Sequence, residues 1–90
     1  MNLIYNNKNY EVVKDYRNGF DEEAVLQRMT DYFEEFDYIF GDWAYGKLRL
    51  KGFYKKENKK TTKINNIENL EKYIKENCAY ECRYFLLEKK

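Results

Sequence analysis

The stretch DYIFGDWAYGKLRLKGFY, residues 37–54, decides the fold of this chain. It contains the only tryptophan, Trp43, and three of the four glycines. Two runs of strand-forming residues flank Ala44-Tyr45-Gly46, where Gly46 can supply the positive φ that a tight hairpin turn needs. The stretch is therefore predicted to form a β-hairpin with strands over residues 38–43 and 47–54.

The second strand of this hairpin alternates between apolar and basic residues, with Leu48 and Leu50 on one face and Lys47, Arg49 and Lys51 on the other. Strict alternation would place Phe53 on the basic face. We expect a β-bulge at Gly52, which would shift the phase and return Phe53 to the side of the leucines.

The chain before this hairpin predicts a shorter hairpin followed by a helix. Strand candidates at 3–5 and 10–16 flank a polar turn rich in asparagine. Asp21 is a good N-cap, and apolar residues recur with helical spacing from Val25 to Phe36. We expect a helix from about 22 to 35 that packs its aromatic stripe on a sheet.

The chain after the hairpin predicts a loop, a helix and a last strand. Residues 55–63, KKENKKTTK, lack apolar side chains and are expected to form a mobile loop. A helix over about 67–77, capped by Asn65 or Asn66, would carry the ion pairs Glu68–Lys72 and Glu71–Lys75. The run 82–88 is apolar on both faces and is expected to be an interior strand.

These elements predict a single domain, residues 1–90, of the α+β class. The order is ββαββαβ, with a mainly antiparallel sheet and two helices packed on one face. Hydrophobic residues make up 43% of the chain, which argues against a disordered protein despite 37% charged residues. No apolar run is long enough to cross a membrane and the N-terminus has no hydrophobic signal core, so a cytoplasmic location is expected.

Charge is unevenly distributed along the chain. Residues 47–63 contain eight basic residues and one acidic residue, whereas residues 21–37 contain seven acidic residues and one basic residue. If the fold keeps these segments apart, one pole of the molecule will be basic and the other acidic.

The residue types argue against an enzyme. Histidine and serine are absent, which removes the commonest general base, metal ligand and hydroxyl nucleophile. No catalytic, cofactor-binding or metal-binding residues are assigned, and no cofactor is expected. Cys78 and Cys82 are expected to be reduced and packed in the core. The alternative is a zinc site, completed across a dimer or by Glu76 and Glu81.

Three segments of the sequence together resemble one known family. RNGFDEEA at residues 17–24, the hairpin sequence at 37–54 and CAYECRYFLLEK near the C-terminus resemble the YutD-like family, small proteins of Gram-positive bacteria. The resemblance is collinear over nearly the whole chain, and its GDW…LRLKGF string is specific. One departure is Glu81, where the family usually has a glycine. The resemblance implies a compact α+β fold and a bacterial cytoplasmic protein, and it supplies no catalytic residues.

The hairpin residues that are not assigned to the hydrophobic core suggest a binding surface at the hairpin tip and on its basic face. Aromatic and basic side chains together favour single-stranded RNA or another nucleic acid as the partner. One alternative is a protein partner that docks on the acidic helix or the aromatic hairpin. Another is that the lysines only solvate an edge strand and a loop, which protects the strand from aggregation. The sequence does not indicate an oligomeric state. The candidate surface consists of Arg17, Asp42, Trp43, Tyr45, Arg49, Lys51, Lys55 and Lys56.

Overall fold

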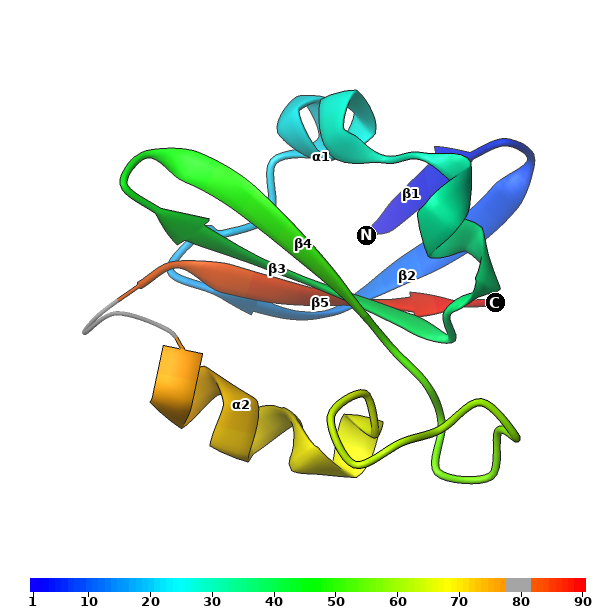
Figure 1. Ribbon diagram of the computed structural model, residues 1–90. Helices are drawn as coiled ribbons and strands as arrows, with labels where there is room; N and C mark the ends of the chain where they lie inside the picture. Colours follow the sequence, from blue (N-terminus) through cyan, green and yellow to red (C-terminus); the bar gives the residue numbers. More distant parts are fainter. Residues whose placement is uncertain (78–81) are drawn as a thin grey trace.

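A computed structural model describes residues 1–77 and 82–90 of the chain. Its centre is a five-stranded sheet in which every neighbouring pair of strands is antiparallel (Figure 1). The order across the sheet is β1-β2-β5-β3-β4, so the C-terminal strand is the middle one, as its two apolar faces predict. The strands are β1 (Asn2–Tyr5), β2 (Lys8–Tyr16), β3 (Tyr38–Ala44), β4 (Lys47–Phe53) and β5 (Tyr84–Lys89).

Two α-helices and two 3-10 helices complete the fold in the order expected from the sequence. They are α1 (Glu22–Arg28), η1 (Asp31–Glu35), η2 (Ile67–Asn69) and α2 (Leu70–Asn77). The α+β class and the ββαββαβ order are thus confirmed. Within the described residues, no helix is long and apolar enough to cross a membrane.

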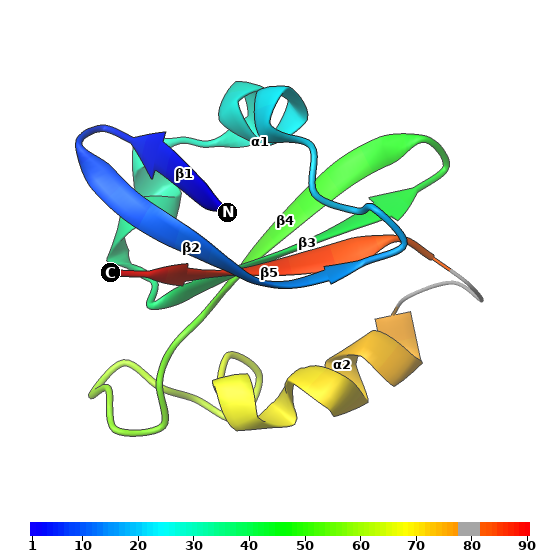
Figure 2. The same ribbon diagram turned by 180° about the vertical axis from the view of Figure 1, so that it is seen from behind.

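The two helices lie on opposite faces of the sheet, which corrects the expectation that both cover one face (Figures 1 and 2). Val25 of α1 belongs to a core cluster that includes Ile39 and Leu87. Leu70 of α2 belongs to a second cluster, which includes Phe40 and Leu86. Adjacent residues of a strand point to opposite faces, so β3 and β5 each contribute side chains to both cores.

The β3–β4 ladder is regular, and the expected bulge at Gly52 is wrong. Every pairing from Tyr38 with Phe53 to Ala44 with Lys47 follows without a register shift. Phe53 is nevertheless fully buried, because the face that it shares with the basic residues is the one covered by α2. Gly52 serves close packing instead, since a Cβ there would lie 2.2 Å from the ring of Phe36.

The helix expected over 22–35 is divided in two. Asp21 caps α1 by accepting a hydrogen bond from the backbone N–H of Ala24 at 3.2 Å, as predicted. The chain then leaves the helical region at Met29, where ψ is 139°, and resumes as η1. Met29 remains buried and Phe33 packs against the same core, so the apolar stripe keeps its role although the helix does not continue.

Candidate functional site

The tip of the β3–β4 hairpin presents one large side chain to solvent. Tyr45 is fully exposed, with a relative accessible area of 102%, and its φ is +54°. Gly46 follows with φ +75°, so the turn needs two positive φ values in succession. Glycine and asparagine adopt this conformation at little cost, whereas a bulky residue is strained there. Tyr45 therefore gives no packing to the fold and is unfavourable for the turn.

Trp43 is held by the protein itself. Its indole Nε1 donates a hydrogen bond to the carbonyl oxygen of Gly19 at 2.7 Å, and the Arg83 guanidinium lies 4.7 Å from the centre of its ring. The ring is half-buried and packs against the core beneath α1. Trp43 thus anchors the chain before α1 and is not an open stacking surface.

Asp42 and Arg49 form an ion pair across the hairpin. Asp42 is 2% exposed, and its Oδ1 accepts a hydrogen bond from Arg49 Nε at 3.0 Å while Oδ2 accepts one from Nη2. The carboxylate raises the pKa of the Arg49 guanidinium through this hydrogen bond. Nη2 also donates to the carbonyl oxygen of Asn77 at 3.2 Å, which ties β4 to the end of α2. Asp42 is therefore structural and can act on a ligand only through Arg49.

The other candidate residues are distributed over separate parts of the molecule. Lys51 lies on the face of β4 that α2 covers, with its ammonium 5.1 Å from the Phe53 ring centre. Lys55 and Lys56 are exposed beyond the end of β4 opposite the hairpin tip (Figure 1). Arg17 follows β2, with its guanidinium 5.5 Å from the centre of the neighbouring Tyr16 ring. The eight residues do not form one continuous surface.

The loop after β4, which the sequence predicts to be mobile, is hydrogen-bonded to the acidic segment. Asp37 Oδ2 accepts hydrogen bonds from the backbone N–H of Lys55 at 2.8 Å and from Asn58 Nδ2 at 3.1 Å. Glu35 Oε2 accepts one from Lys60 Nζ at 2.9 Å. The two charged segments meet here, so the condition for separate basic and acidic poles, that the fold keeps these segments apart, is not met at this end of the acidic segment.

The pKa values of this tether reflect its hydrogen bonds. The hydrogen bonds that Lys60 and Tyr54 donate to the Glu35 carboxylate hold its pKa below the usual value. Burial, together with the hydrogen bond from its hydroxyl to Glu35 at 2.8 Å, raises the pKa of Tyr54 to about 12. The ionised carboxylate and the neutral phenol are thus the forms that hold the loop in place.

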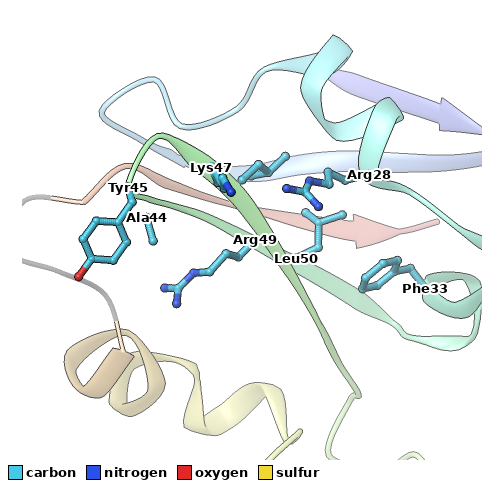
Figure 3. A pocket seen from close by; sticks show the side chains of 8 residues that line it. Arg28, Phe33, Ala44, Tyr45, Lys47, Arg49 and Leu50 are labelled. Atoms are coloured by element: carbon cyan, nitrogen blue, oxygen red, sulfur yellow. The ribbon is translucent and has the colours of Figure 1, made fainter.

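A groove of about 620 Å³ runs along β4 (Figure 3). Leu48 and Leu50 pack with the core on the α1 side of the sheet. Figure 3 shows Leu50 and Arg28 on this side, whereas the side chain of Arg49 points toward α2. In the described part of the chain β4 pairs with β3 alone, so it is an edge strand. Arg28 and Phe33 were not among the binding residues predicted from the sequence. The signal that could have identified Arg28 is that it is the only basic residue in the acidic segment 21–37. The lining residues are Arg28, Phe33, Ala44, Tyr45, Lys47, Leu48, Arg49 and Leu50.

A second group of aromatic and basic side chains lies across β2 and β5. The rings of Tyr16 and Tyr84 stack with centres 4.8 Å apart and planes 18° apart. Lys14 Nζ lies 5.7 Å from the centre of the Tyr84 ring. Apart from Arg17 the sequence missed this group, because it depends on the register that pairs Tyr16 with Tyr84.

Cys82 differs from the expectation of a reduced thiol, because it is disulfide-bonded. Cys78, which was expected to be reduced and packed in the core, lies outside the described residues. The zinc alternative used Cys78 and Glu81, which also lies outside them. Among the described residues, no three histidine, cysteine or acidic side chains gather as metal ligands.

Comparisons with known proteins agree with the fold. The family model described as "Putative antitoxin YutD-like" matches residues 4–88. The protein named "Putative antitoxin YutD" from Bacillus subtilis is 42% identical over 87 residues, which cover 97% of this chain and 96% of that protein. The solution NMR structure of YutD from the same bacterium superposes with a TM-score of 0.83 at 41% identity, covering all of this chain and 82% of the other. The chain belongs to the YutD-like family.

Proposed function

We propose that this protein is a non-catalytic binding module of the antitoxin type, which docks a protein partner on its β3–β4 hairpin. The name of the Bacillus subtilis relative, a putative antitoxin, suggests a partner of this kind. The observation that carries the proposal is Tyr45, a fully exposed aromatic residue in a strained turn position. Exposed tyrosines are common anchors in protein interfaces, and strain is tolerated most often where function requires it.

The edge of β4 supplies the rest of the docking surface. An edge strand offers backbone hydrogen-bonding groups to a strand of another protein. The partly buried Leu50 provides an apolar contact in the groove, while Lys47 and the exposed Arg28 provide positive charge beside it. The chemistry fits an extended partner segment that alternates apolar and acidic residues.

Tyr45→Asn separates the binding role of this residue from its role in the fold. Asparagine suits the positive φ, so we expect the free energy of unfolding to rise by about 0.5–1 kcal/mol. Partner binding should be lost, because the aromatic anchor is gone. Urea denaturation measures the first effect, and co-purification of the partner from Bacillus subtilis cells measures the second.

Photo-crosslinking identifies the partner directly. A benzophenone amino acid at position 45 should give one dominant light-dependent adduct, which mass spectrometry identifies. The same amino acid at position 32 is the matched control, because Tyr32 is also exposed but lies on η1. Equal adducts from both positions, or a Tyr45→Asn variant that still binds the partner, would contradict the proposal.

Nucleic-acid binding is a second candidate function, and it rests on a different surface. The stacked Tyr16 and Tyr84 rings beside Lys14 and Arg17 combine aromatic and cationic groups in the way that single-strand binding sites do. The basic residues after β4, by contrast, are partly neutralised by Glu35. RNA binding is therefore better supported on β2 and β5 than on the surface expected from the sequence.

A further inference from the structure

A hollow of about 380 Å³ lies beside α2, on the side of the sheet opposite the groove's leucines. Four parts of the chain line it: β4, the loop before η2, η2 itself and α2. Its volume falls within the range of small-molecule sites. The lining residues are Lys51, Lys63, Ile64, Asn69, Lys72, Tyr73, Glu76 and Asn77.

The hollow collects positive charge that is not neutralised. It is lined by three lysines and a single carboxylate, that of Glu76. In the described part of the chain, none of Lys51, Lys63 and Lys72 forms an ion pair. The Glu68–Lys72 pair expected on the helix surface is therefore not formed. These ammonium groups remain available to an anion.

Lys51 is held in place although it has no carboxylate partner. It is only partly exposed, and its Nζ lies 5.1 Å from the centre of the Phe53 ring and 5.4 Å from that of Tyr73. Two aromatic faces stabilise a cation at such distances. The rings leave its hydrogen-bond donors unused, and a bound phosphate or carboxylate would satisfy them.

The walls of the hollow are also fixed. Asn69 Nδ2 donates a hydrogen bond to the carbonyl oxygen of Lys63 at 2.9 Å, which ties the loop to the helix. On the other side of Lys51 and Tyr73, a hollow of about 260 Å³ leads to Arg49, whose charge Asp42 already neutralises. An anion should therefore prefer the lysine side.

The remaining lining residues suit an apolar or planar group. The side chain of Ile64 is 77% exposed and lines the hollow. Tyr73 offers ring surface, and Asn69 and Asn77 are polar neighbours. We propose that this hollow binds a small phosphorylated molecule that carries a planar ring, the chemical class of the nucleoside phosphates. The lysines hold the phosphates, and Tyr73 and Ile64 contact the ring. This site is independent of the hairpin surface.

The test is an amide NMR titration of the full chain with ADP at low salt. We expect saturable shifts that cluster at residues 51, 63–64 and 72–77. Adenosine, which lacks phosphate, should shift these signals at least about tenfold more weakly, because the charge-assisted contacts are missing. Inorganic phosphate distinguishes a site for phosphate alone from one that also uses the ring. Scattered shifts without saturation, or equal binding of adenosine, would overturn the proposal.

Variants then assign the binding to the lysines. Lys72 is exposed on α2, so Lys72→Gln should not unfold the protein. This variant should weaken ADP binding about tenfold. Lys51→Met keeps the aliphatic contact with both rings and should weaken it as much. Lys75→Gln is the matched control, since Lys75 is exposed on the same helix but does not line the hollow. A control variant that binds as weakly as Lys72→Gln would show a general charge effect and refute the site.

Discussion

Asp42 is the charged residue that the described fold encloses most completely. A carboxylate removed from water costs several kcal/mol unless it is paired and hydrogen-bonded. The Arg49 guanidinium supplies both, through two hydrogen bonds from the facing position of β4. The two partners are unequally exposed, because the Asp42 side chain is 3% accessible and that of Arg49 is 48% accessible.

This inequality predicts which half of the pair matters more for stability. Arg49→Met leaves a buried carboxylate alone and should lower the free energy of unfolding by about 2–4 kcal/mol. Asp42→Asn leaves a guanidinium that water can reach and should cost only about 1–2 kcal/mol. Urea denaturation of both variants measures the difference.

The double variant is the control for this comparison. Asp42→Asn combined with Arg49→Met removes the uncompensated charge and should be more stable than Arg49→Met alone. If Asp42→Asn proved the more damaging single change, the pair would not act through burial of the carboxylate.

At the scale of elements, the pattern of residues predicted contacts better than it predicted boundaries. Val25, Met29 and Phe33 follow helical spacing and pack against one core, yet the helix ends at Arg28. No glycine or proline marks the break, so periodicity could not locate it. The end of β4 shows a related error: a covered second face explains Phe53 without the bulge that was expected.

The loop after β4 gives a prediction at this scale. Hydrogen bonds from Lys60 and Tyr54 lower the pKa of Glu35, so its ionised form stabilises the fold at neutral pH. This stabilisation is present above the usual carboxyl pKa of 4.5 and is lost as the pH falls through the lowered value. Glu35→Gln should therefore lower the urea midpoint at pH 7 and have little effect at the acidic end. Amide exchange should speed up in the loop.

Glu57→Gln is the matched control for Glu35→Gln. Glu57 is exposed in the same loop, and no hydrogen bond or ion pair involves its side chain in the described part of the chain. This variant should keep the wild-type urea midpoint across the pH range. A constant difference between Glu35→Gln and wild type at every pH would mean that the carboxylate charge is not what holds the loop.

At the scale of the whole molecule, two strands carry the apolar pattern of a sheet that is covered on both faces, although only residues 82–88 were predicted to be interior. Ile39 and Phe40 are adjacent and both apolar, as are residues 85–87 of the central strand. Such runs indicate strands covered on both faces. Of the candidate surface residues, Tyr45 is exposed as predicted. Asp42 and Trp43 instead have structural roles, and these depend on long-range contacts that the sequence pattern does not show.

The distribution of charge in the folded molecule decides how RNA binding should behave. The net charge is +1, and ion pairs such as Lys60–Glu35 neutralise part of the basic segment. If RNA binds on β2 and β5, about two phosphates can meet Lys14 and Arg17, so a plot of log affinity against log salt should have a slope of about −1.4. Tyr16→Leu should weaken binding of a short oligouridine about tenfold by removing a stacking surface, whereas Tyr32→Leu should not. Fluorescence anisotropy with a labelled RNA measures both. Equal losses in the two variants, or binding that does not respond to salt, would exclude this surface as an RNA site and leave the hairpin as the better supported interface.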